Sequence, residues 1–166
     1  MEIERRFLVQ NIDEKINLNE YEYKEIVQDY LYVDKLTAIR KRKITKNDFK
    51  KYMYTVKTGK KGISVSEYEE EIDEKTYLNL CTNSTYNTII KKRYCIPYMD
   101  GLIIELDIFS GIYEKLAFAE IEYKSEEQAK STKIPEWFGK EISSIVTNSE
   151  MAMTPSDVIF DKLKNL

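Results

Sequence analysis

The sequence predicts an α+β fold in which eight antiparallel strands close into a barrel and helices pack on the outside. Hydrophobic and charged residues alternate at a period of two in eight short segments, which is typical of strands with two chemically different faces. Most of these segments are joined by short connections, which favours antiparallel pairing. The 166 residues contain no Gly-, Ser- or Pro-rich linker, so we expect a single domain over 1–166.

Each expected strand is rich in strand-forming residues and ends at a turn or a change in composition. The segments are 2–9, 28–34, 37–44, 52–58, 63–72, 89–96, 102–109 and 117–124. A Gly59-Lys60-Lys61-Gly62 turn joins the fourth and fifth segments, and a hairpin around Pro97 and Asp100-Gly101 joins the sixth and seventh. The glycine turn lacks the GxxxxGK[ST] spacing, which favours a hairpin over a phosphate-binding loop.

Helices are expected between and after the strands. Asp73 is a suitable N-cap for a helix over 73–81, and a serine precedes a second helix over 125–131. Pro135 opens a short helix through Trp137. An amphipathic C-terminal helix runs from about 149 to 165, with an interruption at Pro155.

Composition excludes several kinds of site. The chain has no histidine, which rules out Ser-His-Asp and Cys-His nucleophiles and His-ligated zinc. Its 26 Lys and Arg nearly balance 29 Asp and Glu, which argues against a nucleic-acid-binding surface. Cys81 and Cys95 form no CxxC motif, the first residues are acidic, and no apolar run approaches the length of a membrane span. We therefore expect a soluble cytoplasmic protein that binds neither nucleic acid nor membrane.

Charged residues gather on one face of the expected strands, because residues two apart in a strand share a face. The acids on this face are Glu2, Glu4, Glu67, Glu69, Glu105, Asp107, Glu120 and Glu122, and the bases are Arg6, Arg40, Arg42, Lys57, Lys91 and Arg93. For any single pair, a solvated outer face is the ordinary explanation.

Two features favour an interior location for this charged face. Like charges occur in pairs within one strand, which destabilises a sheet unless something of opposite sign lies between them. The alternate positions are apolar in the last strands, as at Ile104, Leu106 and Ile121. If helices cover that apolar face, the charged face points into the barrel. A lumen with acidic and basic walls suits a polyanion together with divalent cations.

These residues carry a resemblance to a known family. Glu2-Ile3-Glu4-Arg5-Arg6-Phe7-Leu8-Val9 resembles the ExExK opening of the CYTH, or triphosphate tunnel metalloenzyme, superfamily. Further motifs follow in family order: Ile39-Arg40-Lys41-Arg42, Thr55-Val56-Lys57, Glu67-Tyr68-Glu69, Lys91-Lys92-Arg93-Tyr94, Ile104-Glu105-Leu106-Asp107-Ile108, Ala119-Glu120-Ile121-Glu122-Tyr123 and Trp137-Phe138-Gly139-Lys140-Glu141-Ile142. The resemblance covers roughly 1–150 and is greatest to small bacterial single-domain members.

The resemblance implies an eight-stranded tunnel that hydrolyses a triphosphate with Mg²⁺ or Mn²⁺, inorganic tripolyphosphate being the favoured substrate. It assigns Glu2, Glu4, Glu120 and Glu122 to the metal and Arg40, Arg42, Lys57, Lys91 and Arg93 to the triphosphate. It gives catalytic roles to Glu67, Glu69 and Arg6, with Glu105 and Asp107 as further tunnel residues. It also allows a homodimer.

Two alternatives stay open, and the second is motivated by three departures from the family pattern. Arg6 stands where the family has lysine, and Val65 where many relatives carry a base. Residues 144–148 read Ser-Ile-Val-Thr-Asn, which keeps only Asn148 of an Asp, Tyr and Asn pattern. The alternatives are a class IV-type adenylyl cyclase that makes cyclic AMP from ATP and a non-catalytic polyphosphate- or nucleotide-binding module.

Overall fold

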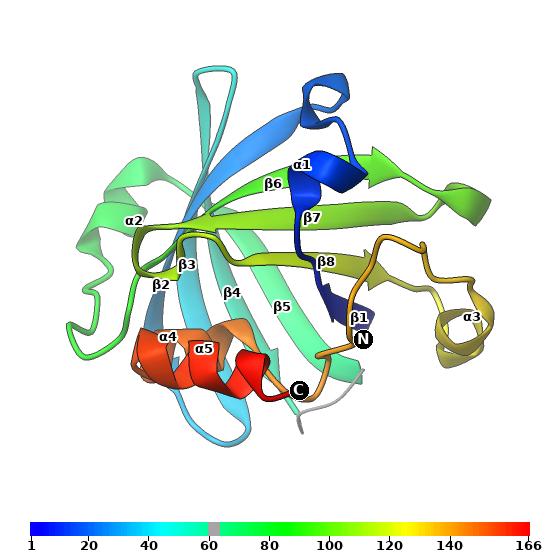
Figure 1. Cartoon of the computed structure of the whole chain (residues 1–166). Coiled ribbons are helices and arrows are strands. Elements are labelled where there is room, and N and C mark those ends of the chain that lie inside the picture. Colours follow the sequence, from blue (N-terminus) through cyan, green and yellow to red (C-terminus); the bar gives the residue numbers. More distant parts are fainter. Residues whose placement is uncertain (60–63) are drawn as a thin grey trace.

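The computed structural model describes residues 1–59 and 64–166, and its eight strands close into an antiparallel barrel (Figure 1). Around the barrel the strands follow the order β1-β5-β4-β3-β2-β6-β7-β8, and β8 pairs with β1. The strands are β1 Glu2–Leu8, β2 Tyr23–Val33, β3 Thr37–Lys46, β4 Phe49–Thr58, β5 Ser64–Ile72, β6 Ile89–Pro97, β7 Ile103–Ser110 and β8 Ala117–Glu122. The predicted eight-stranded barrel is confirmed.

The second strand is longer than the sequence analysis predicted. β2 begins at Tyr23, and the period-two alternation extends back through Lys24 and Ile26. β3 and β4 are also extended, because Asn47 and Asp48 both have positive φ, as a tight two-residue hairpin turn requires. The predicted turn between β4 and β5 falls on 60–62, outside the described residues.

The helices lie on the outside and across one end of the barrel (Figure 1). They are α1 Ile12–Lys15, α2 Glu74–Asn79, α3 Glu126–Ser131, α4 Asn148–Met153 and α5 Ser156–Lys164, with 3-10 turns η1 Leu18–Glu20, η2 Met99–Gly101 and η3 Gly111–Tyr113. The side chains of Asp73 and Ser125 cap α2 and α3 as predicted, and the C-terminal helix is interrupted at Pro155. None of the described helices has the length and apolarity that spanning a membrane requires.

The predicted short helix at Pro135 is wrong. After one turn, in which Phe138 N donates to Pro135 O, the chain runs beside β1 instead. Gly139 N donates to Leu8 O at 2.7 Å, and a Cβ on Gly139 would lie 2.5 Å from that oxygen. The close approach requires glycine, and the backbone of this segment is satisfied by β1 rather than by a helix.

Two hydrophobic clusters decide which strand face points inward. The outward side chains of β7 and β8, including Leu106 and Ile121, are fully buried under the segments that hold α1 and α3. At one end of the barrel, inward-facing Tyr30, Phe109 and Phe118 pack against α4 and α5. The charged face therefore lines the remaining interior, as the sequence pattern predicts.

Candidate functional site

The barrel encloses a charged cavity of about 450 Å³, which we call the wide chamber. Its charged lining consists of Glu2, Glu4, Arg6, Lys24, Arg40, Arg42, Lys46, Lys51, Lys57, Glu67, Glu69, Arg93, Glu105, Glu120 and Glu122. Twelve of the fourteen residues predicted for the site are in this set, contributed by seven strands. Walls of both signs suit a ligand of both signs, or a ligand with its counter-ions.

Ion pairs join residues of β1, β3, β4 and β5 at one side of the wide chamber. Lys57 Nζ lies 2.8 Å from Glu2 Oε2 and 3.3 Å from Glu67 Oε2. Arg42 Nη2 lies 2.6 Å from Glu69 Oε2, and the hydroxyl of Thr55 donates to the same oxygen at 2.9 Å. Burial, followed by the charge of neighbouring Arg40, lowers the pKa of Arg42 to about 10.

Arg6 ties the chamber to the chain segment that precedes α4. Its Nη2 lies 3.0 Å from Glu120 Oε2 and 3.7 Å from Glu4 Oε1. Its Nη1 donates to Val146 O at 3.0 Å, and its backbone N–H donates to Ser143 Oγ. A guanidinium can hold carboxylates and a carbonyl at the same time, because its donors form a rigid fork.

A buried group of three charges lies inside the barrel beside the wide chamber. Lys91 Nζ donates to Asp107 Oδ2 at 2.7 Å, and Arg93 binds both oxygens of Asp107 at 2.7 and 2.8 Å. Burial lowers the pKa of Lys91 to about 8. Lys91 and Asp107 do not line the wide chamber, whereas Arg93 reaches it and also pairs with Glu105. Of the two predicted tunnel bases on β6, the structure brings one to the cavity.

Carboxylates face one another directly across neighbouring strands. Glu4 pairs with Glu122 in the β1–β8 register, and Glu105 pairs with Glu120 in the β7–β8 register. Burial, followed by the charge of Glu120, raises the pKa of Glu4 to about 8. Burial also raises the pKa of Glu2 and of Glu122. A cation between carboxyl groups that face one another stabilises their ionised form.

This carboxylate group fits a divalent cation by its chemistry. Mg²⁺ and Mn²⁺ prefer carboxylate oxygens, and Mg²⁺ keeps several waters when it binds a protein. Within the described residues no three acidic or cysteine side chains already converge on one point. A cation held by these carboxylates would need waters and side-chain rotation to complete its coordination.

The pH dependence of stability tests the protonation of Glu4. A carboxyl whose pKa is higher in the folded chain than its ordinary 4.5 stabilises the fold below that value, and the contribution is lost as pH rises to about 8. Without divalent ions we expect the melting temperature to fall between pH 5 and pH 8, and Glu4→Gln to flatten that fall. Parallel wild-type and variant curves over this range would show that Glu4 ionises normally.

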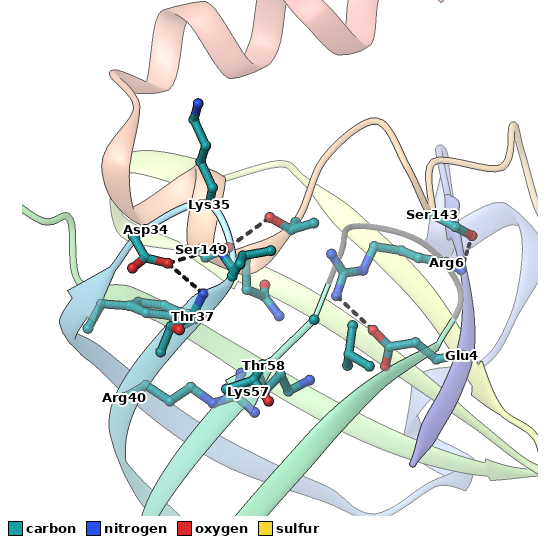
Figure 2. Close-up of a pocket in the computed structure, with 17 residues that line it drawn as sticks. Glu4, Arg6, Asp34, Lys35, Thr37, Arg40, Lys57, Thr58, Ser143 and Ser149 are labelled. Carbon is teal, nitrogen blue, oxygen red and sulfur yellow. Dashed lines mark hydrogen bonds and ion pairs between the residues drawn. The ribbon is translucent and has the colours of Figure 1, made fainter.

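A second cavity of about 120 Å³, which we call the narrow chamber, adjoins the wide chamber (Figure 2). Five residues line both chambers and form what we call the waist: Glu4, Arg6, Arg40, Lys57 and Asn148. Figure 2 shows the ion pair of Arg6 with Glu4, and Arg40 and Lys57 on neighbouring strands.

Sequence reasoning missed two kinds of chamber residue. Lys24 lines the wide chamber because β2 starts early, and its spacing of two residues from Ile26 and four from Gln28 places it on their inward face. Asn148 reaches the waist from α4, and no local pattern places a residue from outside the barrel there. Lys41 points out of the tunnel and is buried, donating to Tyr77 O and Leu80 O at the end of α2.

Comparisons with known proteins agree with this architecture, although no family model matches the chain. An inorganic triphosphatase from Nitrosomonas europaea is 35% identical over 92 residues, which span 55% of this chain and 60% of that protein. The crystal structure of an inorganic triphosphatase has a TM-score of 0.61 and 29% identity, covering 93% of this chain and 95% of that one. A Hippeastrum protein, described as a candidate adenylyl cyclase with a dominant triphosphatase activity, shares the fold at 17% identity and a TM-score of 0.61, with coverage of 78% and 83%.

Proposed function

We propose that this chain, which has the closed barrel and the motif order of the CYTH, or triphosphate tunnel metalloenzyme, superfamily, is a divalent-metal-dependent triphosphatase with inorganic tripolyphosphate as its favoured substrate. The observation that carries the proposal is the wide chamber, whose basic and acidic walls meet inside one cavity. The similarity to an inorganic triphosphatase over nearly the whole of both chains supports it.

The substrate's phosphate oxygens bind to Arg40, Arg42, Lys57 and Arg93 in this proposal. Arg40 is the most available of them for binding a phosphate, because it forms no ion pair with any described residue. Its side chain is buried in the barrel, and its Nε has no hydrogen-bond partner among the described residues. Guanidinium forks bind phosphate through two parallel hydrogen bonds. Lys91 does not touch the phosphate in this proposal. It donates a hydrogen bond to Asp107, and Asp107 orients Arg93. Lys91 is then a positioning residue.

Glu2, Glu4 and Glu122 hold the metal in this proposal, and Glu120 supports them. Although burial alone would raise it, the pKa of Glu120 is held well below its usual range by the guanidiniums of Arg6 and Arg93. Glu120 therefore stays ionised beside Glu4. A bound Mg²⁺ or Mn²⁺ polarises phosphoryl oxygens and lowers the pKa of a bound water.

The ion pairs of the chamber imply that metal and triphosphate bind together. Lys57 must leave Glu2 to reach a phosphate, and Arg42 must leave Glu69. A cation that neutralises the released carboxylates removes the cost of that exchange, and an anion that pairs with the released bases removes the cost of metal binding. The coupling is reciprocal, so each ligand raises the affinity for the other.

The remaining roles concern the reacting groups. Glu67 and Glu69 lie on β5 beside Lys57 and Arg42, where either carboxylate can accept a proton from an attacking water. The guanidinium of Arg6 lies at the waist, where it neutralises negative charge on the phosphoryl group. The chain's contribution to catalysis is then positioning and charge neutralisation.

A phosphate-release assay tests this proposal. We expect release from tripolyphosphate with Mg²⁺ or Mn²⁺ and none in chelator, with ATP and thiamine triphosphate cleaved more slowly. The chamber's cations neutralise the phosphate chain only when metal occupies its carboxylates, which is why chelator should stop the reaction. Cyclic AMP from ATP would favour the cyclase alternative instead. Ligand-induced thermal stabilisation without any phosphate release would favour the binding module.

The setting of this activity is also part of the proposal. A cavity of about 450 Å³ suits a small molecule. A single domain, a cytoplasmic location and the lack of nucleic-acid and membrane binding stay predictions from the sequence. The resemblance allows a homodimer without predicting one.

A further inference from the structure

The charge of the tunnel ends at the waist. Beyond the five shared residues, the described lining of the narrow chamber carries only Asp34 and Lys35 as charged side chains, and both are exposed. Lys35 points away from the other lining residues in Figure 2. The rest of that lining is apolar or hydroxyl-bearing: Tyr30, Leu36, Thr37, Ala38, Thr58, Gly59, Val65, Ser143, Thr147 and Ser149. A phosphate that passed the waist would find no net positive charge there.

Asn148 is the one waist residue that the barrel strands do not supply. It begins α4, and its side chain is aimed at the point where the two chambers meet. The residue is 8% exposed, and its Oδ1 has no hydrogen-bond partner among the described residues. An unsatisfied buried acceptor costs roughly 1–3 kcal/mol, so an apolar side chain would serve packing better.

The place of Asn148 is fixed by contacts from several elements. Thr147 and Glu150 form a capping box around the first turn of α4. At the other end of the helix, Asn87 Nδ2 donates to Met151 O, and Tyr113 Oη donates to the same carbonyl at 2.7 Å. A held amide offers a donor and an acceptor without net charge. The Nδ2 group of this amide can donate a hydrogen bond to a phosphate oxygen beside Glu4 without adding a charge, and Oδ1, which only accepts, can take a hydrogen bond from water.

We propose that Asn148 is a specificity-determining residue whose amide binds the terminal phosphoryl group at the waist and so registers a chain of three phosphates in the wide chamber. A fourth phosphate would have to enter the narrow chamber or displace the chain from this register. The proposal rests on the proposed triphosphatase function. It predicts discrimination by chain length, which a purely structural role of Asn148 would not change.

The test compares tripolyphosphate with tetrapolyphosphate as substrates of the wild type, Asn148→Ala, Asn148→Ser and the exposed-loop control Ser144→Ala. We expect Asn148→Ala to lower kcat/KM for tripolyphosphate about tenfold, the effect of one lost hydrogen bond to a charged group. The kcat/KM for tetrapolyphosphate should change much less, so that the ratio of kcat/KM for tripolyphosphate to that for tetrapolyphosphate falls. Asn148→Ser should behave in the same way if the alanine variant unfolds. Ser144→Ala should retain wild-type values.

Two results would overturn this inference: an equal loss on both substrates, or no loss on either. A wild type that releases no phosphate would contradict the triphosphatase proposal, not the role of Asn148. In that case the thermal stabilisation of the protein by tripolyphosphate decides the matter. Stabilisation that Asn148→Ala reduces supports the waist contact, and stabilisation that it leaves unchanged excludes it.

Discussion

Glu4→Gln should abolish metal-dependent hydrolysis of tripolyphosphate while the barrel stays folded. Glu4 is a half-buried carboxyl opposite Glu122 and beside Glu120 in the acidic wall. The amide keeps the shape of the side chain but supplies no charge to a cation. We expect a loss of about 1,000-fold in kcat/KM, which corresponds to roughly 4 kcal/mol of transition-state stabilisation. Phosphate release across a metal titration measures it.

The same variant also separates binding from folding. Because Glu4 is costly to ionise in the empty barrel, Glu4→Gln should keep or raise the melting temperature without metal at pH 8. It should lose the extra stabilisation that Mg²⁺ gives the wild type. Glu114→Gln, an exposed carboxyl in the turn before β8, is the matched control and should behave as wild type. Activity near the wild-type level in Glu4→Gln would remove Glu4 from the metal site.

The barrel could be predicted because its signal is local. A period of two along one strand reports the two faces of that strand, and the outer and inner faces here differ in charge. The pattern does not report which residue lies opposite which, since that depends on cross-strand register. The β2–β3 pairing shifts between Tyr30 and Tyr32, and such a bulge resets every partner beyond it. The pair of Arg42 with Glu69 joins β3 to β5 across β4, so it depends on two registers that the pattern of a single strand does not report.

The positions of the segment after Pro135 and of α4 depend on tertiary contacts rather than on a local sequence pattern. Residues after Pro135 carry a helix-start signal, yet their backbone pairs with β1 through Gly139 and Ile142. α4 is held by the side chains of Asn87 and Tyr113, which lie far away in the sequence. Local propensity cannot weigh such contacts. This is why the fourteen strand residues could be proposed from sequence, whereas Asn148 at the waist could be placed only with the structure.

Asp107→Leu should be the most destabilising single change among the tunnel residues. Asp107 is fully buried and neutralises both Lys91 and Arg93. Removing it leaves the Lys91 ammonium without a partner at a site of 2% exposure, whereas Arg93 keeps Glu105 and Glu120. Breaking a buried pair in this way costs about 3–5 kcal/mol. Urea unfolding at pH 7 measures the loss in the free energy of unfolding independently of catalysis.

A double-mutant cycle shows whether the cost comes from the stranded charge. Lys91→Met alone leaves Asp107 bound by both nitrogens of Arg93 and should cost less than Asp107→Leu. Lys91→Met with Asp107→Leu puts two apolar side chains beside Phe109, whose ring lies 5.7 Å from Lys91 Nζ. The double variant should therefore be more stable than Asp107→Leu alone. Additive losses would mean that Lys91 is not paired with Asp107 in the folded protein. If the double variant regains stability but not activity, the buried pair is retained to aim Arg93 at the phosphate rather than to hold the barrel together.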